Sequence, residues 1–243
     1  MHLSAITIDG EAFPGTDNYP FNLAILRNTK TVAFRSPVTY FIGENGSGKS
    51  TLLTAIARAA GIHIWDSPHA PLVANRHADT LHRYVSVDWR DGTTPGAFFA
   101  SDMFRHFSLL LDEWAKTDPG LLEYFGGSSL MAMSHGQSTM AFFESRFRIR
   151  GLYLLDEPEC ALSPRRLIEF LGIIHRAAAT GEAQFIIATH SPILLALPGA
   201  IILSFDSPAI REIAYEDTDH VRAYRSFLAD PQGYLRERGA IIE

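Results

Sequence analysis

Cysteine is almost absent from the sequence, since Cys160 is the only one among 243 residues. A single cysteine excludes an internal disulfide and a zinc cluster built from cysteines. An unpaired cysteine most often packs as a small hydrophobic side chain, so we expect Cys160 to be buried.

Long apolar runs and an excess of positive charge are also missing. No apolar stretch reaches the roughly 20 residues that a membrane-spanning helix needs, and the first residues lack a basic segment followed by an apolar one. We therefore expect a cytoplasmic protein without direct membrane insertion. The net charge of -6 gives no overall attraction toward nucleic acids or anionic membranes, although it is compatible with a local basic patch.

The composition is that of a folded domain. Hydrophobic residues make up 47% of the chain, which excludes intrinsic disorder and suffices for a sizeable core. A length of 243 residues fits one domain with a smaller subdomain. We therefore treat residues 1–243 as a single domain.

The most informative stretch is rich in glycine and follows the phosphate-binding pattern G-x-x-x-x-G-K-[ST]. A β-branched and aromatic run, residues 37–42, precedes it, and residues 52–60 after it are rich in helix formers. The alternative, a glycine turn with an accidental Gly-Lys-Ser, does not require these flanking elements. The predicted nucleotide-binding residues are Gly43, Glu44, Asn45, Gly46, Ser47, Gly48, Lys49, Ser50 and Thr51.

The chemistry of this loop follows from its residue types. Glycine accepts positive φ, so successive backbone N–H groups can point inward at a helix N-terminus and bind an anion. Lys49 is predicted to reach the β- and γ-phosphate oxygens, and Ser50 to hold Mg²⁺. By itself the loop indicates only nucleoside triphosphate binding.

Two further apolar runs end in chemically useful residues. Residues 152–157 form a hydrophobic strand that ends in Asp156 and Glu157. Asp156 is predicted to be a second Mg²⁺ ligand, and Glu157 a general base or water-orienting group. Residues 184–189 lead into His190, predicted to contact the γ-phosphate or the attacking water. The plainer alternatives are a loop cap for the two acids and a structural histidine.

A fourth short segment precedes a predicted helix over residues 138–147. Its serine is a good helix cap, and small residues at a helix N-terminus form an anion site. Alone, it would indicate only a capped surface helix. The segment consists of Ser134, His135, Gly136 and Gln137.

Taken in order, these motifs resemble those of the ABC-type ATPases over about residues 1–205. The branch resembles the soluble chromosome-maintenance and DNA-repair heads, and the small stand-alone bacterial AAA/ABC-like ATPases, more than transporter subunits. The matching motifs are Walker A at residues 43–51, the signature at 134–137, Walker B at 152–157, a D-loop at Ala161-Leu162-Ser163 and the switch histidine His190.

The resemblance implies an α/β P-loop NTPase fold. It has a mainly parallel central sheet flanked by helices, an N-terminal antiparallel β portion and a small helical signature subdomain. We assign residues 1–60 and 150–205 to the nucleotide-binding core, 100–148 to the signature subdomain and 206–243 to a C-terminal extension.

The resemblance also implies an activity, namely Mg²⁺-dependent hydrolysis of ATP. ATP would gate a head-to-tail homodimer in which Ser134, His135, Gly136 and Gln137 complete the site of the other protomer. The dimer would drive a conformational change in an unidentified protein partner or nucleic acid, in repair or defence. The alternatives are the ATPase subunit of a membrane transporter, a module that uses ATP only to dimerise, and a small-molecule kinase.

The sequence departs from the family pattern in two places. No glutamine lies between Thr51 and Gly136, where the family has one that senses Mg²⁺ and water. Asp102 is a candidate replacement ligand, with a surface helix cap as its alternative. His135 stands where the family signature has glycine. The adenine-stacking side chain is left open among Phe13, Tyr19 and Phe21.

Three weaker patterns complete the prediction of local structure. Residues 23–26 are predicted as a strand because they form a short apolar run. Residues 93–100 are predicted as the strand that returns from residues 82–90 across a turn at Asp91-Gly92. Residues 63–79 are predicted to be irregular.

Overall fold

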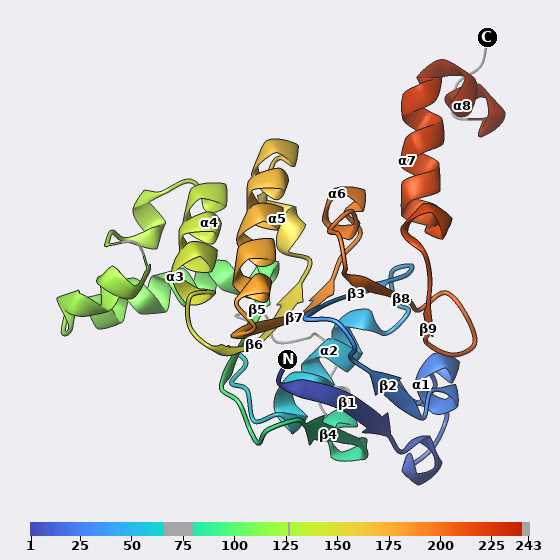
Figure 1. Cartoon of the computed structure of the whole chain (residues 1–243), viewed down its shortest axis with the longest axis horizontal. Helices are drawn as coiled ribbons and strands as arrows, with labels where there is room; N and C mark the ends of the chain where they lie inside the picture. Colours follow the sequence, from blue (N-terminus) through green and yellow to red (C-terminus); the bar gives the residue numbers. More distant parts are fainter. Residues whose placement is uncertain (66–79, 126, 240–243) are drawn as a thin grey trace.

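The centre of the molecule is a six-stranded sheet, as seen in the computed structural model (Figure 1), which describes residues 1–65, 80–125 and 127–239. Its strand order is β5-β6-β7-β3-β8-β9, with β9 antiparallel to β8 and the other pairs parallel. The strands are β3 (Val38–Ile42), β5 (Gly96–Ala100), β6 (Gly151–Asp156), β7 (Ala183–Ala188), β8 (Ile201–Ser204) and β9 (Arg211–Glu212).

A second sheet of three antiparallel strands lies beside the first. Its central strand is β1 (Leu3–Ile8), which pairs with β2 (Thr31–Ala33) and β4 (Val85–Trp89). This is the antiparallel N-terminal portion that the family resemblance implies. The predicted α/β fold with a mainly parallel central sheet is therefore confirmed.

Helices cover both faces of the main sheet (Figure 1). The helix after β3, α2, packs between the two sheets, whereas α3, α4 and α5 cover the opposite face. Two C-terminal helices project from the body. The helices are α1 (Ala24–Asn28), α2 (Lys49–Ala59), α3 (Ser101–Ala115), α4 (His135–Arg146), α5 (Pro164–Ala179), α6 (Pro192–Leu195), α7 (Asp219–Ala229) and α8 (Pro231–Glu237).

Strand β3 is buried along its whole length because both faces of the sheet are covered. Tyr40 and Ile42 point into the core under α3, α4 and α5, while Phe41 points into the core around α2. Side chains alternate between the two faces in every strand. In β3 the side chains on both faces meet apolar neighbours. The strand that enters the phosphate loop is thereby fixed from both sides.

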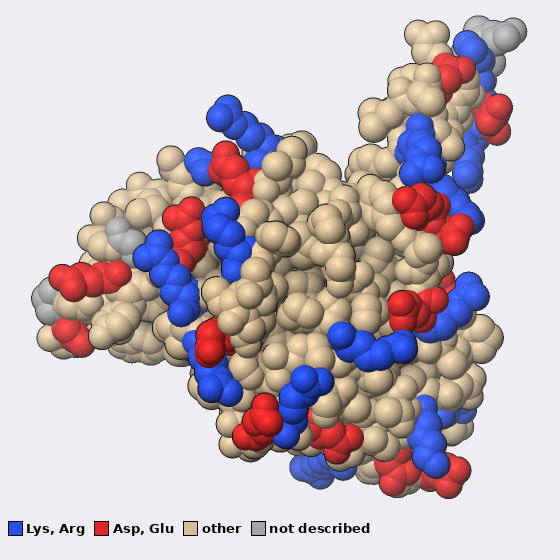
Figure 2. All heavy atoms as spheres, viewed as in Figure 1, with Lys and Arg blue, Asp and Glu red and all other residues tan. Residues whose placement is uncertain are grey.

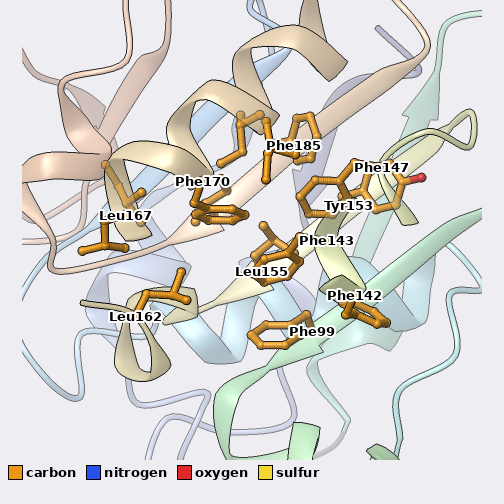
Figure 3. Packing of buried hydrophobic residues seen from close by; sticks show 14 of the residues in the cluster. Phe99, Phe142, Phe143, Phe147, Tyr153, Leu155, Leu162, Leu167, Phe170 and Phe185 are labelled. Carbon is orange, nitrogen blue, oxygen red and sulfur yellow. The ribbon is translucent and has the colours of Figure 1, made fainter. Parts of the chain in front are cut away.

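Aromatic side chains dominate the core between α4, α5 and the sheet (Figure 3). The rings of Phe143 on α4 and Phe170 on α5 stack with centroids 4.4 Å apart. Phe147 contacts Phe185 of β7 edge to face at 4.8 Å. Such pairs add roughly 0.5–1.5 kcal/mol each beyond the area that they bury. They join α4, and therefore residues 134–137 at its start, to the main sheet.

Two of the local predictions are wrong. Residues 23–26 lie at the start of α1, with Ile25 and Leu26 buried, because a four-residue apolar run does not distinguish helix from strand. Strand β5 pairs in parallel with β6 and does not return along β4. Its apolar sequence suits burial on both faces. The prediction for residues 63–79 lies almost entirely outside the described residues.

One buried side chain joins the two sheets. Gln184 on β7 is fully buried, and its Oε1 accepts hydrogen bonds from the backbone N–H groups of His2 (2.7 Å) and Leu3 (2.8 Å). Its Nε2 donates to the carbonyl of Leu3 at 2.9 Å. A single amide therefore satisfies three backbone groups at the start of β1.

Replacing this amide with an apolar side chain of similar size tests that connection. We expect Gln184→Leu to lower the free energy of unfolding by about 3 kcal/mol, because three buried backbone groups lose their partners. Urea denaturation measures the change. The matched control is Gln232→Leu at an exposed position of α8, expected to stay within about 0.5 kcal/mol of wild type. A loss below about 1 kcal/mol for Gln184→Leu would contradict the assigned role.

Candidate functional site

The candidate site lies where the parallel strands end. Carboxyl ends of parallel strands meet at one edge of a sheet, which is where α/β proteins bind ligands. Here that edge collects residues from five strands. They are residues 43–51 after β3, Ser101 after β5, Glu157 after β6, His190 after β7 and Asp206 after β8.

The loop after β3 has the backbone shape that its glycines permit. Gly43, Gly46 and Gly48 all have positive φ, at 148°, 83° and 102°. A Cβ on Gly43 would lie 2.9 Å from Oδ1 of Asp206, and one on Gly48 would lie 2.9 Å from Leu23. A side chain at either position would be strained by the positive φ and would also require Asp206 or Leu23 to move. The N-terminus of α2 begins directly after this loop.

Lys49 is buried at the start of α2, with only 4% of its surface exposed. Its Nζ donates to the carbonyls of Gly43 (2.6 Å) and Glu44 (3.0 Å), and no carboxylate of the described residues is within ion-pair distance. Burial lowers the pKa of Lys49, while nearby carboxylates, Glu157 first, oppose that shift. A buried ammonium held only by carbonyls fits a bound anion.

Oxygen atoms suited to a small divalent cation lie beside the lysine. The Ser50 hydroxyl donates to Oδ1 of Asp156 at 2.9 Å. Mg²⁺ prefers oxygen ligands and usually takes one or two from protein, completing its shell with phosphates and water. The Ser47 hydroxyl in the same loop is buried without a partner. Together with Lys49, these residues fit Mg²⁺ and a triphosphate.

Glu157 has the only positive φ among the described non-glycine residues, with φ 46° and ψ 53°. Its N–H donates to the carbonyl of Ala188 at 2.9 Å, and its carbonyl accepts the Ser101 hydroxyl at 2.6 Å. The end of β7 and the first residue of α3 thus hold it in the left-handed region. Such strained backbone is commonest at functional positions.

The Cys160 side chain is exposed, so the prediction that it is buried is wrong. The short 3₁₀ turn Pro158–Ala161 directs it outward, and its Sγ lies 3.5 Å from Oε2 of Glu157. Partial burial, followed by the hydrogen bond to Glu157 and nearby carboxylates, raises the pKa of the Cys160 thiol to about 11. The thiol is therefore protonated at neutral pH.

His190 is half-buried, and its Nε2 lies 3.8 Å from Oε1 of Glu157. Burial lowers its pKa, followed by the charges of Lys49 and His220, so the imidazole is neutral at neutral pH. Its backbone N–H donates to Oε1 of Glu159 at 2.7 Å. The same oxygen accepts the Thr189 hydroxyl, and burial raises the pKa of this carboxyl.

Ser134 forms the predicted helix cap, but α4 begins at His135 and not at residue 138, so residues 135–137 make up its first turn. The Ser134 hydroxyl accepts from the N–H of Gln137 at 3.4 Å, and the Gln137 side chain accepts from the N–H of Ser134 at 3.0 Å. Gly136 lies against the D-loop region, since a Cβ there would be 2.9 Å from the carbonyl of Ala161. Ser134, His135 and Gln137 are exposed, and no hydrogen bond or ion pair of the described residues joins them to the phosphate loop.

The predicted site residues therefore fall into two groups. Residues 43–51, Asp156, Glu157 and His190 share one edge of the sheet, whereas residues 134–137 stand apart at the start of α4. Asp102 lies in the first turn of α3, and its replacement of the missing glutamine stays a prediction.

Sequence analysis missed several residues that shape the site. Ser101 and Asp206 each follow the end of a parallel strand, so knowledge of the strand order would have found them. Asp206 accepts the N–H of Glu44 at 2.7 Å. No sequence pattern indicated a role for Glu159 or His220, because their contacts with His190 depend on the tertiary fold.

Comparison with known families agrees with this geometry. Residues 120–196 match the family "AAA domain, putative AbiEii toxin, Type IV TA system", and residues 21–63 match a second AAA domain family. The match over residues 21–63 contains the phosphate loop. The match over residues 120–196 contains the segment 134–137, Asp156, Glu157 and His190. In both segments the chain resembles AAA/ABC-type P-loop ATPase domains. The candidate site contains the residue types that nucleoside triphosphate hydrolysis uses.

Curated proteins similar to this chain include import proteins. The cobalt import ATP-binding protein CbiO of Salmonella typhimurium is 29% identical over 171 residues, 64% of this chain and 62% of that protein. The thiamine import ATP-binding protein ThiQ of Cereibacter sphaeroides is 29% identical over 175 residues, 62% of this chain and 69% of ThiQ. The alignment with CbiO thus spans less than two thirds of the length of that relative.

Solved structures of two kinds share the fold. The SMC head domain of Thermotoga maritima has a TM-score of 0.50 at 15% identity, over 88% of this chain and 100% of that one. CbiO1 of Clostridium perfringens, part of the ABC transporter complex cbiONQ, has a TM-score of 0.51 at 16% identity, over 98% and 100%. At such identities the likeness shows the fold alone. Among the described residues, no helix combines the length and the apolar composition that a membrane span requires.

The strained backbone at Glu157 can be tested by two substitutions that both remove the carboxylate. We expect Glu157→Gly to unfold with a free energy about 1 kcal/mol higher than Glu157→Gln, because glycine adopts positive φ without strain. Chemical denaturation of the two variants measures the difference. Glutamine is the matched control because it keeps the strain and removes the charge. Equal stability of the two variants would show that this conformation stores no strain.

Proposed function

We propose that this protein is an ATPase that works as an ATP-gated, head-to-tail homodimer and drives a conformational change in a partner. The observation that carries the proposal is the separation of its two groups of residues. One chain gathers Lys49, Asp156, Glu157 and His190 at one edge of the sheet. Ser134, His135 and Gln137 are exposed at the start of the capped helix α4, which leaves them available to a second molecule.

The roles of the residues follow from their contacts. Lys49 and the loop N–H groups bind the phosphates, and Ser50 and Asp156 hold Mg²⁺, which neutralises phosphate charge when bound. Glu157 accepts the proton of the attacking water. A bond forms between the water oxygen and the γ-phosphorus, and the bond from that phosphorus to the β,γ-bridging oxygen breaks. His190 donates from Nε2 to a γ-phosphate oxygen.

Dimerisation follows from linkage. Exposed N–H groups at the start of α4 carry the positive end of the helix dipole, which favours a phosphate. ATP that contacts Lys49 of one protomer and Ser134 of the other binds the closed dimer better than the monomer, and so stabilises it. Cleavage of the γ-phosphate removes that contact, and the dimer opens.

Among the three aromatic candidates, we assign adenine stacking to Tyr19. Phe21 is buried and packs with Phe13 at 4.8 Å, so both rings are engaged in the core. Tyr19 is 39% exposed, and its hydroxyl contacts the Thr51 hydroxyl at the end of the phosphate loop. The ring is therefore partly exposed and lies beside the phosphate loop, where a base could reach it.

The partner is a protein or a nucleic acid, in repair or defence. Figure 2 shows Lys and Arg side chains interspersed with Asp and Glu on the face displayed, without a large area of one sign. Together with the net charge of -6, this favours a protein partner.

A second candidate function is the ATPase subunit of an importer. The names of CbiO and ThiQ favour it. The missing glutamine between Thr51 and Gly136 disfavours it, because in transporter subunits that residue couples to the membrane partner. Co-purification with an integral membrane protein would support this alternative over the first.

Trapping the ATP-bound state tests the dimer. We expect Glu157→Gln to form a dimer in saturating Mg-ATP with little phosphate release, because it binds ATP but cannot accept the proton. Size-exclusion chromatography with light scattering measures the mass. The control is Glu157→Gln combined with Lys49→Ala, which should stay monomeric. If Glu157→Gln also stays monomeric in saturating Mg-ATP, the dimer proposal is wrong.

A further inference from the structure

A second histidine contacts the candidate γ-phosphate sensor. Nδ1 of His190 lies 3.0 Å from Nε2 of His220, and the two ring centroids are 5.1 Å apart. The two residues come from different parts of the fold, since His190 follows β7 and His220 belongs to the first turn of α7. The contact therefore ties the C-terminal extension to the nucleotide site.

The first turn of α7 is firmly anchored. Thr218 is fully buried, donates its hydroxyl to the carbonyl of Tyr215 at 2.9 Å and accepts the N–H of Val221 at 3.3 Å. Val221 is itself buried, whereas Tyr224 and Leu228 further along the helix are exposed. The helix then projects from the body (Figure 1). His220 thus stands on the part of α7 that is held in place.

The surroundings of His190 decide which ring nitrogen carries its proton. Nε2 faces Oε1 of Glu157 at 3.8 Å, and a carboxylate attracts an N–H and repels a lone pair. Lys49 and burial both disfavour the doubly protonated ring. A neutral His190 with its proton on Nε2 has a free lone pair on Nδ1. Only a donor can pair with that lone pair, and Nε2–H of His220 is at the required distance.

We propose that His220 is a positioning residue that donates to Nδ1 of His190 and so keeps the proton of His190 on Nε2, ready for the γ-phosphate. The inference rests on the role proposed above for His190. It assigns a function to His220, a residue of the C-terminal extension. This residue belongs neither to the phosphate loop nor to the strand-end residues of the site. The second nitrogen of a functional imidazole commonly needs such a partner to fix its tautomer and orientation.

Steady-state kinetics of two substitutions tests the hydrogen bond. We expect His220→Ala to lower kcat for ATP hydrolysis by about tenfold, with KM for ATP changed less than about twofold, because triphosphate binding does not depend on the contact. His220→Gln places an amide N–H near the position of Nε2, and we expect it to recover kcat to within about threefold of wild type. The control is His175→Ala at an exposed position on α5, expected to leave kcat unchanged.

A spectroscopic signature separates positioning from general support of the fold. In the wild type, ¹⁵N chemical shifts of labelled histidine should show His190 protonated on Nε2, with His190→Ala identifying its signals. In His220→Ala we expect a mixture of both tautomers. An unchanged tautomer in His220→Ala would overturn the proposal, as would His220→Gln with kcat as low as His220→Ala.

The double variant separates this inference from the proposed function. If His220 acts through His190, then His190→Ala with His220→Ala should have the kcat of His190→Ala alone. Full turnover by His190→Ala would instead remove the proposed role of His190. Loss of turnover in His190→Ala with full turnover in His220→Ala would overturn only the positioning role.

Discussion

The burial of the Lys49 ammonium group is the constraint on which the site depends. A charge in this position loses its hydration, and the carbonyls of Gly43 and Glu44 replace only part of it. The nearest carboxylates act at a distance, since Lys49 forms no ion pair with any residue that the structure describes. The site is therefore electrostatically incomplete until an anion arrives, and the positive-φ glycines leave room for one beside it.

Rigid packing places the two groups of site residues. Strands β6 and β7 hold Asp156, Glu157 and His190 at the same edge of the sheet as that ammonium, and both strands are buried on both faces. The aromatic core fixes α4 against α5, and the capping box fixes the direction in which its first N–H groups point. A chain built this way presents one half of a nucleotide site on the sheet and the other half elsewhere. In the proposed dimer, ATP binding and chain association become one equilibrium.

Much of the site was predictable because its signals are local in sequence. The phosphate loop, the strand that ends in Asp156 and Glu157, and the strand before His190 each combine an apolar run with its chemical residue. Pairing across the sheet was not predictable. At Gly96 a Cβ would lie 2.4 Å from the carbonyl of Leu152, so glycine there serves the β5–β6 pairing. No pattern in the sequence identifies residue 152 as its neighbour. The contact of His220 with His190 depends on the same kind of long-range placement.

The central claim is that each site is completed by a second molecule, and mixing two inactive variants tests it most directly. Lys49→Ala loses the phosphate side of its own site, and Ser134→Asp keeps the helix cap but places a negative charge where the partner's phosphate would bind. Only a mixed dimer contains one intact site. The account predicts that each variant alone is inactive and that an equal mixture recovers about a quarter of wild-type ATP hydrolysis. Full activity of Ser134→Asp alone, or an inactive mixture in which mixed dimers form, would contradict it.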